Sequence, residues 1–132
     1  MTKGIAVKLP AKKKRQALPK EKLNALIIDA LQDVKGLEIT QIDLRHVDDA
    51  PVNYFIICHG TSHTQVAALG GRVMQRVAEE LDLRPNHTEG KRNGTWVLVD
   101  FFDVVVHIFY QETRNYYRID ELWSDGVVTR YE

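Results

Sequence analysis

Residues 95–109 carry the pattern that most restricts the fold of this chain. Two β-prone segments, residues 95–100 and 103–109, alternate in side-chain character, and a strand sends successive side chains to opposite faces of its sheet. If the two strands form a hairpin across Phe101-Phe102, one face is purely aliphatic and holds Val97, Val99, Val104, Val106 and Ile108. Such a face predicts a sheet packed under a helix and excludes an all-helical bundle.

The opposite face of the same hairpin is mixed in character. A two-residue turn pairs Trp96 with His107, Leu98 with Val105 and Asp100 with Asp103. One interpretation is a surface for another macromolecule, because Trp is enriched at the centres of protein interfaces. The other is that a third helix covers this face and Trp96 is core. The register is a hypothesis, since a tight turn prefers Asn, Asp or Gly over Phe-Phe.

The remaining pattern predicts one domain over residues 19–132. A helix begins at Pro19 and ends by Gly36, and a second begins at Ser62, which has the capping-box spacing to Gln65. Gly70 and Gly71 inside this second helix each cost about 1 kcal/mol relative to Ala. Residues 53–58 are nearly all apolar and predict a strand buried on both faces. Weaker patterns predict strands at residues 38–44 and 85–89 and a short helix at 112–118. The order α-β-β-α-β-β-β-α predicts an α/β (α+β) fold with a mixed sheet of about five strands flanked by helices.

Few residues offer catalytic or metal-binding chemistry. Asp103 and His107 are about 13 Å apart along one strand, too far for a direct hydrogen bond, so a structural histidine is favoured over a dyad. Cys58 and His59 point to opposite faces and cannot easily share a metal, and a thiol in an apolar strand is usually a small buried hydrophobe. We therefore expect no metal, no cofactor and no catalytic residue.

The loop Gly60-Thr61-Ser62 precedes a helix, where backbone amides attract phosphate. It is similar to the Gly-Ser start of nucleotidyltransferases, but the two downstream acids that hold magnesium in those enzymes are missing. A turn with a helix cap is the simpler interpretation, and a nucleotide-binding loop over Gly60, Thr61 and Ser62 is the alternative.

Charge divides the chain into two parts. Residues 1–22 carry eight basic side chains and one acid, while the whole chain holds 18 of each. We therefore expect residues 1–18 to be a disordered basic arm before a mildly acidic domain. Such an arm either contacts a polyanion such as RNA or acts as a solubilising tail. The single cysteine and the lack of a signal sequence or long apolar run predict a cytoplasmic protein with no membrane segment.

Several segments in this order and spacing resemble the ribosomal silencing factor family, also called the Iojap family. They are residues 53–58, 60–62, 89–90, 96–100 and 103–109, then Arg114, Tyr117 and residues 121–123. Phe102 departs from the pattern, because family members often have Gly there.

The resemblance implies a nucleotidyltransferase-like sheet without catalytic acids. It also implies binding to the large ribosomal subunit through its fourteenth protein, which blocks joining of the small subunit and represses translation, notably under nutrient limitation. By the same resemblance, no reaction is catalysed, Trp96 belongs to the contact surface and homodimers can form. The predicted contact group is Trp96, Leu98, Asp100, Asp103, Val105 and His107, supported by Tyr54 and by Gly60, Thr61 and Ser62.

Overall fold

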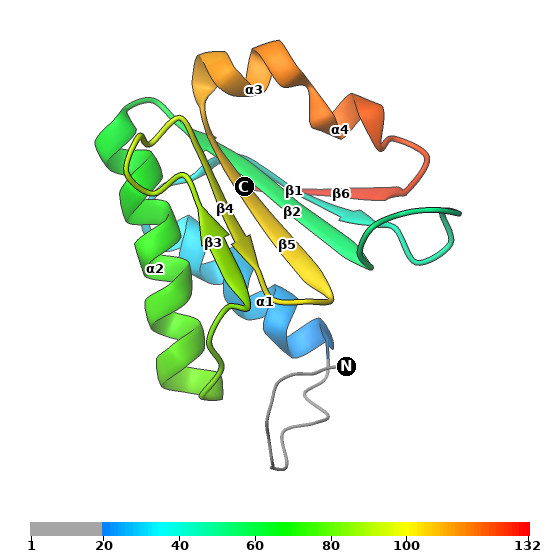
Figure 1. The fold of residues 1–132 in the computed structure, drawn as a ribbon, viewed down its shortest axis with the longest axis horizontal. Helices are drawn as coiled ribbons and strands as arrows, with labels where there is room; N and C mark the ends of the chain where they lie inside the picture. The colour runs from blue at the N-terminus through cyan, green and yellow to red at the C-terminus, as the bar shows by residue number, and fades with distance from the viewer. Residues whose placement is uncertain (1–19) are drawn as a thin grey trace.

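A six-stranded mixed sheet organises the chain (Figure 1). The computed structural model describes residues 20–132, so the predicted basic arm lies outside the described residues. In chain order the elements are α1 (Lys20–Asp33), β1 (Leu37–Asp43), β2 (Tyr54–Gly60), α2 (His63–Leu81), β3 (His87–Glu89), β4 (Trp96–Asp100), β5 (Val104–Tyr110), α3 (Gln111–Tyr117), α4 (Ile119–Leu122) and β6 (Val127–Tyr131). No described helix is long and apolar enough to cross a membrane.

The strands lie in the order β3-β4-β5-β2-β1-β6. Only the central neighbours β2 and β5 run parallel, and every other pair is antiparallel. The predicted mixed sheet flanked by helices is therefore confirmed. The prediction of about five strands was wrong because it missed β6, and the short helix α4 before β6 was also missed. All but the last residue of β6 are exposed, so the strand has no buried face to reveal it in the sequence.

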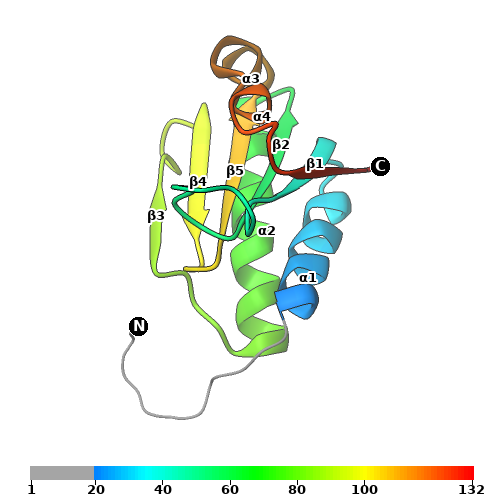
Figure 2. The same ribbon diagram turned by 90° about the vertical axis from the view of Figure 1, so that its right-hand side faces the viewer.

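The helices α1 and α2 cover one face of the sheet, and α3 and α4 lie at one end of it (Figure 2). The covered face holds the aliphatic residues predicted from the hairpin pattern. Val97, Val99, Val104, Val106 and Ile108 are all buried in a core with the apolar stripes of α1 and α2. This part of the prediction is confirmed, and burial of that face is the main source of stability.

The hairpin between β4 and β5 has a different register from the predicted one. Trp96 pairs with Phe109, Leu98 with His107 and Asp100 with Val105, a shift of two residues. The shift arises because the turn is centred on Phe102 and Asp103. Phe102 has a φ of 74°, and the amide of Phe101 donates to the Val104 carbonyl at 2.9 Å.

Asp100 makes this turn possible for a bulky residue. Its carboxylate accepts a hydrogen bond from the Phe102 amide at 2.8 Å, which is how Asp side chains replace backbone contacts in turns. Because side chains alternate with a period of two, a shift of two residues leaves every residue on its predicted face.

The helix α2 begins and packs as the sequence predicts. The Ser62 hydroxyl accepts from the Gln65 amide at 3.0 Å, and the Gln65 side chain returns to the Thr61 amide at 2.9 Å. A Cβ added at Gly70 lies 3.0 Å from Val97 on β4, so the missing side chain brings the helix close to the sheet. A Cβ at Gly71 meets nothing within 4 Å and points to open space.

Candidate functional site

Trp96 lies on the face of the sheet that α1 and α2 leave uncovered. Trp96 is half-buried and packs against a second hydrophobic core. This core includes Ile42, Phe55, Ile57, Phe109 and Ile119. Its indole Nε1 donates a hydrogen bond to Nδ1 of His107 at 3.1 Å. The ring also lies 4.8 Å from that of Phe109 and 4.9 Å from that of Tyr117, centroid to centroid. Three contacts therefore fix the orientation of a large side chain that still reaches the surface.

His107 supports Trp96 from beneath and is itself 6% exposed. The rings of Phe55 and His107 pack at right angles with their centroids 4.7 Å apart. Burial lowers the pKa of His107 to about 4, so the imidazole is neutral near pH 7. Because Nδ1 accepts from Trp96, the proton lies on Nε2, which has no hydrogen-bond partner among the described residues. The two rings are tilted by 48°, so the hydrogen bond rather than parallel stacking joins His107 to Trp96.

The uncovered face is neither fully open nor closed by a third helix. Part of it is covered by Val47, Ala50, Val52, Ile119 and Trp123, from the loop before β2 and from the α4 region. Trp96, Leu98 and Asp100 are half-buried and still reach the surface. Next to them α3 presents Tyr116 and Tyr117, exposed by 79% and 51%. Sequence reasoning from the strands alone missed this aromatic extension, although Tyr117 was among the family-like residues.

The other predicted contact residues are distributed unevenly. Val105 and His107 share the face of Trp96 but are buried, so they support this surface from within. Asp103 lies in the exposed turn, where its carboxylate accepts from Asn53 Nδ2 at 3.3 Å. The acids Asp100 and Asp103 thus both hold the turn.

Tyr54 does not belong to this surface. It is 5% exposed and packs in the core on the opposite, helix-covered face. The prediction failed because Tyr54 opens a strand whose side chains are buried on both faces, so the sequence gives no sign of which face it occupies.

The loop Gly60-Thr61-Ser62 has the geometry of a helix cap. The Gln65 side chain accepts a hydrogen bond from the Thr61 amide, and the Gln65 backbone amide donates one to the Ser62 hydroxyl. A Cβ on Gly60 would lie 2.8 Å from the Gln65 side chain. These groups are therefore engaged within the chain, which favours the cap over a phosphate cradle. The loop lies at the Trp96 end of the sheet, since Gly60 pairs with Tyr110 and Trp96 with Phe109.

The remaining sequence candidates are buried. Burial raises the pKa of Cys58 to about 12, which leaves the thiol protonated as a small core residue. Within residues 20–132, no three His, Cys, Asp or Glu side chains are arranged to hold a metal ion.

Comparison with known proteins identifies the family of this chain. The family described as "Ribosomal silencing factor during starvation" matches residues 17–132. This chain belongs to the ribosomal silencing factor family. The predicted resemblance is thereby confirmed, and the match spans the domain that contains the Trp96 surface.

Two bacterial relatives are similar to this chain over most of their length. A ribosomal silencing factor of Halalkalibacterium halodurans is 32% identical over 85% of this chain and 94% of its own. That of Bacillus subtilis is 36% identical over 74% and 80%. The crystal structure of a Chromobacterium violaceum protein superposes with a TM-score of 0.76 at 34% identity, over 81% of this chain and 88% of that one. A more distant mouse relative, 31% identical over 62% of this chain and 35% of its own, is named "Mitochondrial assembly of ribosomal large subunit protein 1".

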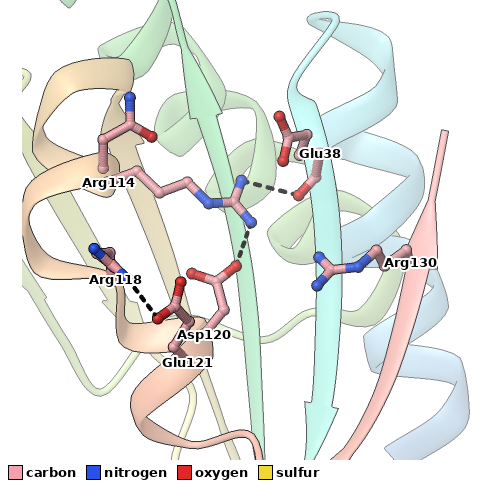
Figure 3. Close-up of a pocket in the computed structure, with 7 residues that line it drawn as sticks. Glu38, Arg114, Arg118, Asp120, Glu121 and Arg130 are labelled. Atoms are coloured by element: carbon pink, nitrogen blue, oxygen red, sulfur yellow. Dashed lines mark hydrogen bonds and ion pairs between the residues drawn. The ribbon is translucent and has the colours of Figure 1, made fainter.

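A second cluster of polar and charged residues surrounds Arg114, a family-like residue on α3 (Figure 3). The side chain is 6% exposed, and its guanidinium donates to the Glu38 carbonyl at 2.9 Å and to Asp120 at 2.7 Å. It also lies 2.9 Å from Nδ1 of His59. Arg114 therefore ties the starts of β1 and α4 to the end of β2.

The surroundings of Arg114 form a charged cleft of about 470 Å³. Its charged lining residues are Glu38, Arg114, Arg118, Asp120, Glu121 and Arg130. Burial alone would raise the pKa of Asp120, but the hydrogen bond and charge of Arg114 outweigh it and hold that pKa below its usual range. The cleft is lined by three acidic and three basic side chains, so their charges balance. The contacts of Arg114 indicate that these charges stabilise the fold.

Replacing Arg114 by Gln will destabilise the fold by up to about 3–5 kcal/mol, because it removes a buried guanidinium and leaves the half-buried Asp120 carboxylate without its partner. The matched control is Arg118→Gln, in which the lost pair with Glu121 is 63% and 68% exposed, so its removal should change stability little. Urea denaturation measures both differences. Equal losses in the two variants would contradict the role assigned to Arg114.

Acid will weaken the fold through His107. The unfolded state binds this proton near the ordinary pKa of 6.5 and the folded state only at about 4, so between these values the unfolded state holds more protons. Stability therefore falls as pH drops from 6.5 to 4, by up to about 3 kcal/mol from this residue. Denaturation at several pH values should show a shallower decline in His107→Asn and an unchanged one in His46→Asn, an exposed control. The same decline in all three proteins would show that His107 is not the source.

Proposed function

We propose that this protein is a ribosomal silencing factor that binds the large ribosomal subunit through its fourteenth protein. Occupying that face prevents the small subunit from joining and represses translation, notably under nutrient limitation. Family membership supports the ribosomal assignment. The name of the mouse relative, with its reference to the ribosomal large subunit, favours that subunit as the partner.

The observation that carries the proposal is the state of Trp96. An indole held by a hydrogen bond to His107 and by two ring contacts, yet only half-buried, has already lost most of its conformational freedom. Binding a partner then costs little additional side-chain entropy. Leu98 and Asp100 extend the surface along β4, and Tyr117 extends it onto α3.

The mechanism is steric and needs no reaction. The polar groups of the loop at residues 60–62 and of the turn after β4 form hydrogen bonds within the chain. Binding alone is therefore the proposed activity. The protein acts in the cytoplasm, and a capacity to form homodimers belongs to the same proposal.

Introducing a carboxylate at the centre of the surface will abolish binding to the large subunit. Trp96→Glu places a charge where the partner buries an apolar ring, a change that costs several kcal/mol at an interface centre. Tyr117→Glu tests the rim with a residue that is already half-exposed. Both variants are mixed with purified large and small subunits, and co-sedimentation and the amount of joined ribosome are measured.

The matched control for this experiment is Gly71→Glu, because a side chain there points to open space on the outer side of α2. We expect the control to bind the large subunit and reduce subunit joining as the unchanged protein does. Thermal melts establish that each variant is folded. Full binding by a folded Trp96→Glu protein would refute the assignment of the surface, and no binding by the unchanged protein would refute the ribosomal function.

The proposal includes contact between ribosomal RNA and the basic residues near the start of the chain. Six of them lie within residues 1–18, and phosphate contacts made by lysines weaken as salt rises. Removing residues 1–18 should therefore reduce ribosome affinity more at low salt than at high salt. The same loss at both salt concentrations would mean that the segment makes no electrostatic contact.

A further inference from the structure

A groove runs between α1 and the β1–β6 edge of the sheet, on the face opposite Trp96. Its volume is about 390 Å³, and its lining includes Glu21, Asn24, Asp29, Tyr54 and Tyr131. The residues come from α1, β2 and β6, so distant parts of the chain build it. The proposed ribosomal surface shares none of its accessible residues with this groove.

Asn24 gives the groove an unused acceptor. The side chain is 5% exposed, and its Nδ2 donates to Gln41 Oε1 at 3.4 Å. Its Oδ1 is buried and has no hydrogen-bond partner in the described part of the chain. A buried carbonyl oxygen without a donor is uncommon in folded proteins. The groove therefore lacks one hydrogen-bond donor at a defined position.

The other polar groups of the groove fit a cationic donor. Glu21 and Asp29 provide two carboxylates from one stripe of α1, although Asp29 also pairs with Arg76 at 2.6 Å. Tyr54 and Tyr131 provide aromatic rings, and rings of this kind attract ammonium groups. Arg45 lies over the Tyr54 ring at 5.2 Å, which shows that a cation is accepted at that end. A carbonyl, carboxylates and aromatic rings together form a site for a lysine ammonium.

The chain itself carries the matching lysines. Lys12, Lys13, Lys14 and Arg15 precede α1, which begins at Lys20, and Glu21 at the start of that helix lines the groove. From Lys20 back to Lys12 an extended chain reaches up to about 26 Å. The stripe of α1 from Glu21 to Gln32 is about 16 Å long. The lysines can therefore reach any part of the groove, and the tether gives them an effective concentration of about millimolar.

We propose that this groove binds lysine side chains of the chain's own N-terminal segment, residues 3–15, in the protein free of the ribosome. Charge complementarity, the tether at Lys20 and the unpartnered Asn24 oxygen carry the assignment. The same lysines cannot lie in the groove and on RNA at once, so RNA competes with the groove for them. This competition rests on the proposed function, whereas the docking itself does not.

The test compares full-length proteins by NMR, without ribosomes. Neutralising the segment in the quadruple variant K12Q, K13Q, K14Q and R15Q should shift the side-chain amide signal of Asn24 and the ring signals of Tyr131. Glu21→Lys, which repels the segment, should shift the same signals in the same direction. The control Glu112→Lys changes the charge of an exposed residue on α3 and should leave them unchanged.

Trypsin cleavage provides a second readout. Docked lysines are protected, so cleavage after residues 12–15 should be several-fold faster in Glu21→Lys than in the unchanged protein at low salt, and equal in both at high salt. Unchanged signals of Asn24 and Tyr131 in the quadruple variant would overturn the proposal. Shifts produced only by added free polylysine would also overturn it and assign the groove to a basic segment of another molecule.

Discussion

The parallel pairing of β2 with β5 is the constraint on which the rest of this structure depends. Two parallel strands cannot be joined by a short turn, so α2 and the β3–β4 hairpin fill the connection between them. The pair lies in the middle of the sheet with nearly all its side chains buried on both faces. One face takes α1 and α2, and among residues 20–132 the other is covered only by short helices and a loop. The partial cover of that second face is what leaves Trp96 at the surface.

The sequence predicted the two faces better than the turn that joins them. The alternation in residues 95–109 assigns each side chain to a face, and that assignment survives a register shift of two residues. The position of the turn depended on a positive φ at Phe102 stabilised by the Asp100 carboxylate. Local preference disfavours such a conformation for Phe, so only the folded hairpin reveals it.

Residues with no periodic pattern were harder to predict. β6 was missed because an exposed edge strand carries no alternation of buried and exposed positions. Tyr54 was grouped with the Trp96 surface although it lies on the other face, because a strand buried on both sides gives no contrast between its faces. Arg114 was named only through the family resemblance. Its role depends on carbonyls and side chains up to 77 residues away in the chain, which no local pattern encodes.

The two faces of the sheet separate two kinds of contact. Trp96 and Tyr117 offer apolar and aromatic area on one face, whereas the groove of α1 offers carboxylates and a carbonyl on the other. A segment held in that groove leaves Trp96 uncovered, so its release to RNA does not alter the protein contact itself. Under the proposed function, the RNA contact adds to the protein contact through the covalent connection, and the affinity gained is set by the tether length. Two weak and chemically different contacts on one small domain can in this way give a tight and salt-sensitive attachment.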